Sequence, residues 1–296
     1  MRLQDFYYSL YSPLIGQGKL CSFLRFFIRC IANFHLRIHF SISTSLSTTI
    51  DSGTIVSLTS FPARIEYAWI AIESIIRQQI RPERILLWLS ADQFDSIDSL
   101  PSKLQKQQKY GLEIRIVNGD VRSHKKYTYA FKEYPNKRII LIDDDIIYRS
   151  DFLKKLVEEY KSSIWEKRIV CYYALHKKYD TLGQLLPYKA WIKEFDESSE
   201  EDLFFGSGGG IISMACDYYV DLTDIDLAMK LTPTADDIWL NAMSKLANAK
   251  IIKIGHGLFL PVIIEGNEDL FRINNLENKN DEQLQNIIKY YDRLVL

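Results

Sequence analysis

Three consecutive acids, Asp143, Asp144 and Asp145, follow the apolar run at residues 138–142. Clustered carboxylates after a buried strand repel one another unless a cation lies among them, and a divalent metal ion is the natural candidate. Residues i and i+2 of an extended chain point the same way, so Asp143 and Asp145 can face one ion while Asp144 faces elsewhere. This DxD pattern suits Mg²⁺ or Mn²⁺, which take further oxygens from water and a substrate diphosphate. The alternatives are a loop of solvated acids or a cap for a helix beginning near Asp151.

A second acidic pair, Asp236 and Asp237, opens an expected helix between Thr234 and Trp239. Thr234 is a candidate cap for this helix, and the helix dipole alone favours acids in its first turn. The functional interpretation is a general base, because a neighbouring acid and partial shielding by Trp239 would raise a carboxylate's pKa. Both interpretations stay open from the residues alone.

Four of the five residues at positions 206–210 are glycines, which let the backbone approach a ligand closely or turn with positive φ. A flexible surface loop is the alternative. Aromatic and apolar residues on both sides favour a partly buried segment.

Short apolar runs alternate with helical patterns from residue 54 onward, which predicts an α/β sheet flanked by helices. The expected strands and helices, in chain order, lie at residues 54–60, 66–79, 84–90, 99–109, 113–117, 126–134 and 138–142. Ligands of such sheets bind beyond the carboxyl ends of the strands, so the polar residues that follow these strands are expected on one rim. Neither a GxGxxG nor a P-loop motif occurs, so acids, metal and side chains must hold any nucleotide.

The composition is that of a globular protein of 296 residues, 47% of them hydrophobic, with a formal net charge of −1. One elaborated domain at residues 51–296 is expected, and nothing in the global charge indicates nucleic acid as a partner. The four cysteines show no CxxC spacing, which argues against zinc and fits a reducing compartment.

Residues 1–50 differ from the rest, because the first 45 are aromatic and basic and contain one acid, Asp5. Arg25 and Arg29 interrupt the apolar run after Lys19, so neither a spanning helix nor a signal peptide is expected. A basic amphipathic helix on an anionic membrane surface and a helix packed on the domain's own core are equally good interpretations. The Ser/Thr-rich residues 41–52 are interpreted as a linker.

The ordered set of motifs resembles bacterial GT-A glycosyltransferases, family-2-like, of capsule or O-antigen surface-polysaccharide assembly. The resemblance covers residues 54–292 and is carried by VSLTSFPAR at 56–64 and by residues 125–127, 134–135, 142–145, 148, 206–210, 235–240 and 280–284. It implies a GT-A-type Rossmann-like mixed sheet, a nucleotide-sugar donor with UDP favoured over GDP, Mn²⁺ or Mg²⁺, and a saccharide acceptor, for which a polyprenyl-linked form is open.

The resemblance also implies roles for the acids and for one histidine. Asp145 corresponds to the direct metal ligand, and Asp143 to a contact with the ribose or a metal-bound water. His256 falls where many relatives place a late metal ligand, although a lone histidine is more often structural. Asp237 corresponds to the catalytic base, and Asp236 would orient the acceptor.

Donor and acceptor contacts follow from the same resemblance. The donor-binding candidates, which include the possible nucleoside-base contact Asp92 and two lysines for the diphosphate, are Thr59, Arg64, Asp92, Lys125, Lys126, Asp143, Asp144, Gly208 and Gly209. The lysine pair has a solvated helix face as its alternative. Tyr188 and Trp191 are candidates to stack on an acceptor sugar, with core packing as their alternative.

The predicted reaction is therefore metal-dependent glycosyl transfer, inverting by a single displacement, with retention of configuration as the open alternative. It is expected on the cytoplasmic face of the cell membrane, with peripheral contact through residues 1–45. A haloacid-dehalogenase-type phosphatase is the strongest rival, because its DxD also follows an apolar strand. Against it, three expected strands precede Asp143, and position 147 is Ile where that family has Thr or Val. A nucleotidyltransferase would need a glycine-rich basic first loop, and a non-catalytic, membrane-associated sugar-binding scaffold remains the alternative without chemistry.

Overall fold

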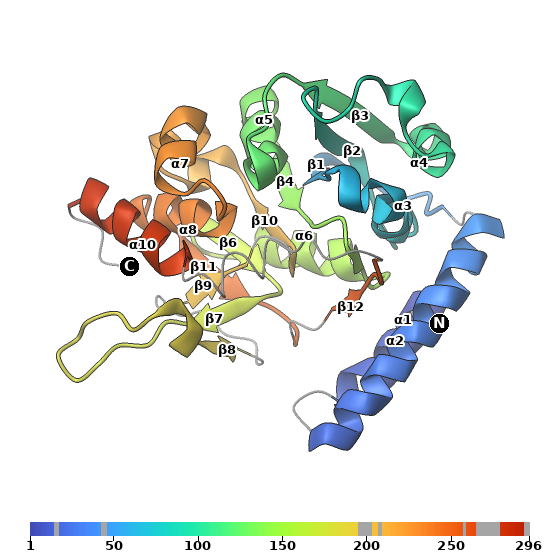
Figure 1. Cartoon of the computed structure of the whole chain (residues 1–296), viewed down its shortest axis with the longest axis horizontal. Helices are drawn as coiled ribbons and strands as arrows, with labels where there is room; N and C mark the ends of the chain where they lie inside the picture. The colour runs from blue at the N-terminus through green and yellow to red at the C-terminus, as the bar shows by residue number, and fades with distance from the viewer. Residues whose placement is uncertain are drawn as a thin grey trace.

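The computed structural model describes residues 1–14, 18–42, 46–194, 203–206, 209–256, 259–264 and 279–292. Two helices, α1 (Leu3–Tyr11) and α2 (Gly18–Ile42), precede an α/β domain (Figure 1). Its central elements in chain order are β1 (Ile50–Thr59), α3 (Pro62–Ile76), β2 (Arg81–Ser90), α4 (Ser102–Gln107), β3 (Leu112–Val117), α5 (Lys125–Glu133), β4 (Arg138–Leu141), β5 (Ile146–Ile147), α6 (Phe152–Ser162), β6 (Arg168–Cys171), β7 (Ala174–His176), β8 (Ile192–Glu194), β9 (Leu203–Phe205), β10 (Ile211–Ser213), α7 (Ile225–Leu231), α8 (Asp236–Leu246), β11 (Lys250–Lys253), β12 (Leu260–Pro261) and α10 (Lys279–Tyr290).

Among the described residues, seven strands form the central sheet in the order β11-β6-β10-β4-β1-β2-β3. The neighbours β4, β1, β2 and β3 run parallel, as do β6 and β11, whereas β10 runs antiparallel to both β4 and β6. The predicted mixed α/β sheet is therefore confirmed. Two smaller antiparallel sheets, β12-β5 and β8-β7-β9, lie beside it.

Alternating side chains of the strands feed two hydrophobic cores on opposite faces of the sheet. In β1, Val56 and Leu58 join the core beneath α3, α6 and the N-terminal helices, while Ile55 joins the core beneath α5, α7, α8 and α10. Figure 1 shows α7, α8 and α10 on one side of the molecule and α1 and α2 on the other. Short apolar strands buried on both faces explain the near-continuous apolar runs of the sequence.

The N-terminal helices pack on the domain along one side. The Tyr8 hydroxyl donates to the carbonyl of Ile147 at 2.5 Å, and Asp5 accepts from Ser150. In α2, Asn33 hydrogen-bonds the backbone of Pro261 and Ile263. The expected packing on the domain's own core is thus present for one face of this segment.

Several boundaries differ from expectation: β1 begins at Ile50 rather than 54, and α3 covers Pro62–Ile76 rather than 66–79. The predicted linker at 41–52 begins inside α2 and ends inside β1, with residues 43–45 outside the described part. The helix expected at 99–109 is shorter: α4 covers Ser102–Gln107 only, because Pro101 precedes it and the left-handed Gly111 follows a 3₁₀ turn.

Candidate functional site

The three consecutive acids lie in a turn between β4 and β5, at the carboxyl edge of the central sheet. Asp144 is buried, whereas the side chains of Asp143 and Asp145 are 37% and 30% exposed. Asp144 accepts a hydrogen bond of 2.5 Å from the Ser60 hydroxyl and one of 3.2 Å from Arg64. Burial raises the pKa of Asp144, and these two donors oppose that rise. The middle acid therefore anchors the turn, and its neighbours face outward.

Arg64, in the first turn of α3, provides one cation for this turn. Its Nη1 lies 3.2 Å from Asp144 and 2.9 Å from Asp145. Burial alone would lower the pKa of Arg64, but Asp145, Asp144 and Asp143 raise it on balance. Its guanidinium neutralises the acidic turn in this structure, and the predicted nucleoside contact of Arg64 stays a prediction.

Lys126 of α5 provides the second cation and joins the two acidic motifs. Its ammonium lies 3.0 Å from Asp143 and 3.0 Å from Asp236, with only 4% of the side chain exposed. Burial lowers the pKa of Lys126, but Asp143, Asp236 and Asp237 together raise it above its ordinary value. Lys126 therefore stays charged, and it holds the turn after β4 against the first turn of α8.

Hydrogen bonds of buried side chains hold this arrangement in place. The Ser57 hydroxyl donates to the carbonyl of Lys126 and accepts from Nε1 of Trp88 at 2.9 Å. The Tyr148 hydroxyl accepts from the backbone N–H of Asp143 at 2.9 Å. Sequence reasoning assigned no role to Ser57, Ser60 or Tyr148. For Ser57 the available signal was a polar residue inside the apolar strand β1, which needs a buried partner.

The second acidic pair opens α8, as the helix pattern predicted, but Thr234 does not cap it. The N-cap is Ala235, without a side-chain hydrogen bond, because Thr234 bonds Gln283 of α10 instead. Asp236 is buried against Lys126, while Asp237 is half-buried.

The charge of Asp237 acts on two tyrosine side chains. Burial raises the pKa of both Tyr188 and Tyr173, and the charge of Asp237 raises each further. Asp236 therefore pairs directly with the buried ammonium of Lys126, whereas the charge of Asp237 acts on Lys126 and on both tyrosines.

The remaining donor candidates are more dispersed. Lys125 is buried and pairs with Asp120, so it is separate from the Lys126 network. The Thr59 hydroxyl donates to the carbonyl of Trp88 at 2.8 Å, which ties β1 to β2. Asp92 is exposed just beyond the carboxyl end of β2. Of the two lysines proposed for a diphosphate, only Lys126 contacts the predicted DxD.

The glycine-rich segment is only partly described, since Ser207 and Gly208 lie outside the described residues. At Gly209 a Cβ atom would come within 2.5 Å of Tyr173 and 2.8 Å of Phe259. At Gly210, which has φ +95°, it would lie 2.2 Å from the Phe152 ring. Close aromatic packing thus accounts for both glycines, and the flexible surface loop is the wrong interpretation for this part.

The two acceptor candidates differ in burial. Trp191 is 7% exposed, its ring lies 5.1 Å from that of Phe204, and its Nε1 donates to the carbonyl of Leu186. Trp191 therefore belongs to the core, as the alternative interpretation held. Tyr188 is half-buried, lies 4.8 Å from Trp191 between ring centroids, and borders Asp237.

Within the described residues, no three His, Cys, Asp or Glu side chains are grouped to hold a metal ion. His256 is exposed beyond β11, so the predicted set of Asp143, Asp145 and His256 is not assembled. The two outward carboxylates still fit Mg²⁺ or Mn²⁺, because these ions accept one or two carboxylates and complete their shell with water and substrate phosphate.

No family model matches the sequence, and no curated protein sequence matches it. Among solved structures, it is similar to S. aureus TarS 1–349, at 12% identity and TM-score 0.45, over 72% of this chain and 59% of that one. It is also similar to a mannosyltransferase from Pyrobaculum calidifontis in complex with GDP-Man and Mn²⁺, at 12% identity and TM-score 0.46, over 99% and 77% of the two chains. A third is the 4-diphosphocytidyl-2C-methyl-D-erythritol synthase of Anaerococcus prevotii, at 16% identity and TM-score 0.45, over 77% and 98%. These distant likenesses assign no activity.

Proposed function

We propose that this chain is a metal-dependent glycosyltransferase that moves a sugar from a nucleotide-sugar donor to a saccharide acceptor. The observation that carries the proposal is the ion-pair bridge of Lys126 between Asp143 and Asp236, 3.0 Å to each. A glycosyltransferase needs a diphosphate-binding site and a general base that lie no farther apart than the length of its substrates. The buried cation Lys126 links the acidic motif that resembles a diphosphate-binding site, at Asp143, to the acidic motif that resembles the site of the base, at Asp236.

Asp143 and Asp145 would hold Mg²⁺ or Mn²⁺, which when bound supplies charge stabilisation for the departing nucleoside diphosphate. Arg64 and Lys126 already lie against these carboxylates, at 2.9 and 3.0 Å. Two cations beside the acids are well placed to stabilise negative charge that develops on the diphosphate. We infer a UDP-sugar rather than a GDP-sugar as donor.

Asp237 is the proposed general base. It takes the proton of the acceptor hydroxyl while that oxygen bonds to the anomeric carbon and the bond from this carbon to the diphosphate breaks. Asp236 is committed to Lys126 and acts by positioning. This single displacement inverts the configuration at the anomeric carbon, and Tyr188 is the remaining candidate contact for the acceptor sugar.

The proposed acceptor is a saccharide of surface-polysaccharide assembly, carried on a membrane lipid such as a polyprenyl chain. The enzyme would then work as a peripheral protein on the cytoplasmic face of the membrane. The basic, aromatic character of residues 1–45 supports this location.

Asp237→Asn tests the proposal. Loss of a general base typically lowers kcat by about 10²- to 10⁴-fold, whereas nucleotide binding should persist. Asp226→Asn is the matched control, because Asp226 is an exposed acid in the first turn of α7. Sugar transfer would be followed with UDP-, GDP-, CMP- and ADP-linked donors and Mn²⁺ or chelator.

Two results would contradict the proposal. One is full transfer activity in Asp237→Asn. The other is metal-dependent hydrolysis of p-nitrophenyl phosphate without binding of any nucleotide, which would favour the phosphatase.

A further inference from the structure

Helix α2 has two apolar faces on opposite sides. One face packs on the domain through Ala32, Leu36 and Phe40. The opposite face, here called the outer face, consists of exposed apolar side chains spaced three or four residues apart: Leu20, Phe23, Leu24, Phe27, Ile31, Phe34, Ile38 and Ile42. At 3.6 residues per turn these positions form one continuous stripe along the helix. Figure 1 shows α2 along the side of the molecule away from α7 and α10.

The outer face needs an apolar partner, and the charges of α2 indicate its kind. Contiguous exposed apolar stripes of this length mark interaction surfaces. Residues 18–42 contain no acid and carry Lys19, Arg25, Arg29 and Arg37. Arg37 is held against the domain by the carbonyl of Ile263, but α2 as a whole carries a net positive charge. This charge repels a second copy of α2 and is attracted to an anionic lipid surface. None of the described helices is both long and apolar enough to cross a bilayer.

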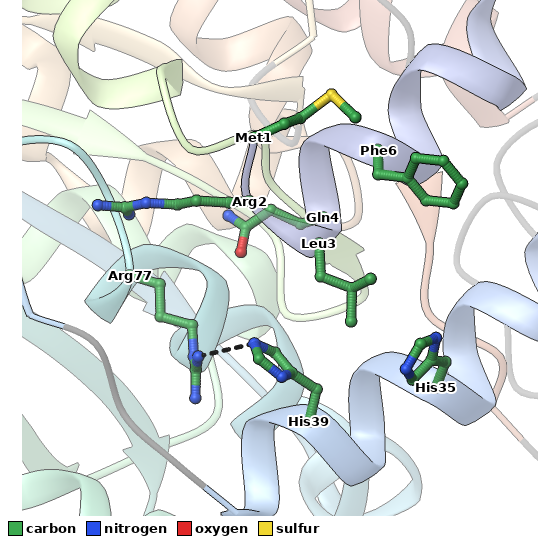
Figure 2. Close-up of a pocket in the computed structure, with 8 residues that line it drawn as sticks. All are labelled: Met1, Arg2, Leu3, Gln4, Phe6, His35, His39 and Arg77. Atoms are coloured by element: carbon green, nitrogen blue, oxygen red, sulfur yellow. Dashed lines mark hydrogen bonds between the residues drawn. The ribbon is translucent and has the colours of Figure 1, made fainter.

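A basic pocket borders this helix. It has a volume of about 550 Å³ and lies between α1, α2 and the end of α3 (Figure 2). Arg2, His35, His39 and Arg77 line it, and no acid is among its lining residues. His35 and His39 alternate in sequence with outer-face residues, so the pocket lies on the flank of that face.

The pocket holds more hydrogen-bond donors than acceptors. Arg77 is 4% exposed; its Nε pairs with Glu73 at 3.0 Å and its Nη1 lies 3.3 Å from Nε2 of His39. Within the described residues, Nη2 of Arg77 and Nη1 of Arg2 are buried without a hydrogen-bond partner. Burial lowers the pKa of Arg77, its partner Glu73 raises it, and the charge of Arg2 lowers it, with a net fall. A bound phosphate would satisfy these donors and relieve the repulsion between the two guanidinium groups.

We propose that the α1–α2 pair docks on an anionic lipid bilayer, with the outer face of α2 among the acyl chains and the pocket holding a lipid phosphate. A helix lying in the interface places its apolar face at the acyl boundary and its flanks at headgroup depth. This docking builds on the proposed peripheral location but does not depend on the proposed transfer reaction, because it involves none of the proposed catalytic or metal-binding residues.

Flotation of the full chain with vesicles tests the proposal. We expect binding to vesicles of phosphatidylglycerol and phosphatidylcholine, and at least tenfold weaker binding to phosphatidylcholine alone. Ile31→Ser with Phe34→Ser should weaken binding at least tenfold, because two large apolar side chains no longer enter the bilayer. Arg2→Gln should weaken binding to the anionic vesicles about fivefold.

Substitutions at exposed apolar residues elsewhere on the chain serve as controls, because they distinguish a specific effect of the outer face from a general effect of surface apolarity. Ile164 and Val220 are 91% and 82% exposed elsewhere on the chain, and Ile164→Ser with Val220→Ser should leave vesicle binding unchanged. Thermal unfolding of each variant checks that the fold is intact. We expect an intact fold, because Ile31 and Phe34 are exposed and their substitution removes no core packing.

Three outcomes would overturn the proposal. The first is vesicle binding that survives the Ile31 and Phe34 substitutions. The second is calorimetric binding of inorganic phosphate, lost in Arg2→Gln, by a chain that binds no vesicles; this would make the pocket a free-phosphate site. The third is a dimer that dissociates in the Ile31 and Phe34 variant without any vesicle binding, which would make a second copy the partner.

Discussion

Replacing Lys126 by Met removes the cation that joins the two acidic motifs while keeping a side chain of similar length. Asp236 is then left buried beside Asp143 without its ammonium partner. Removing one partner of a buried ion pair costs about 3–5 kcal/mol. The Lys126–Asp236 pair, 4% and 10% exposed, belongs to this class. Asp143 is 37% exposed, so its lost pair adds less than about 1 kcal/mol.

We therefore expect Lys126→Met to lower the free energy of unfolding by about 3–6 kcal/mol, which for a chain of this size is a fall in Tm of about 6–12 °C. Because the pKa of Lys126 is raised in the fold, its contribution is complete below the unfolded value of about 10.4 and is lost only as pH rises through the higher folded value. The destabilisation attributable to the lysine charge should thus be present throughout pH 6–9. Urea unfolding at several pH values within this range measures it.

Lys154→Met is the control, since Lys154 is 46% exposed and pairs with Glu158 at 3.8 Å on the surface of α6. It should change stability by less than about 0.5 kcal/mol. In the double variant Lys126→Met with Asp236→Asn, the orphaned charge is gone and part of the lost stability should return. A loss below 1 kcal/mol for Lys126→Met, or no recovery in the double variant, would refute the bridge as a structural link.

Three further predictions concern other parts of the chain. Asp145→Ala should abolish any metal-dependent rise in Tm with nucleoside diphosphate, which at about 100 times the Kd amounts to about 2.7 kcal/mol; an undiminished shift would show that metal and nucleotide bind elsewhere. Gly210→Ala should destabilise the protein by more than about 3 kcal/mol in urea unfolding, because residue 210 has φ +95° and its new Cβ would lie 2.2 Å from a phenyl ring. The control Gly119→Ala, where φ is +78° and no atom lies within 4 Å of the new Cβ, should cost about 1 kcal/mol. Equal losses of stability in the two variants would contradict the steric argument. Burial acts to raise the pKa of Asp51, but hydrogen bonds and nearby cations lower it overall. The stabilisation by Asp51 is therefore complete above its unfolded pKa and is lost as pH falls through its lower folded pKa. Asp51→Asn should cost about 1–2 kcal/mol at pH 7, and this difference from the parent chain should shrink below pH 4.

The sequence by itself determined the α/β class, the main strands and the helix that carries two acids in its first turn. These features are local: β1 and β4 are apolar runs of strand length, and α8 repeats its apolar residues at helical spacing. The position of the acidic turn at the carboxyl edge of the sheet followed as well, because a parallel sheet brings such ends to one rim.

Only the tertiary structure decided which partner each polar group found. Lys125 and Lys126 are adjacent and chemically identical, yet helix geometry directs one to Asp120 and the other to both acidic motifs. Thr234 found Gln283 of a distant helix in place of the local cap that its position suggested. For α2, whose residues are apolar on two sides, the contacts of Asn33 with the segment at 259–264 selected the face that packs and left the other exposed. Sequence periodicity reports that a face is apolar, but what covers that face depends on contacts between residues far apart in the chain.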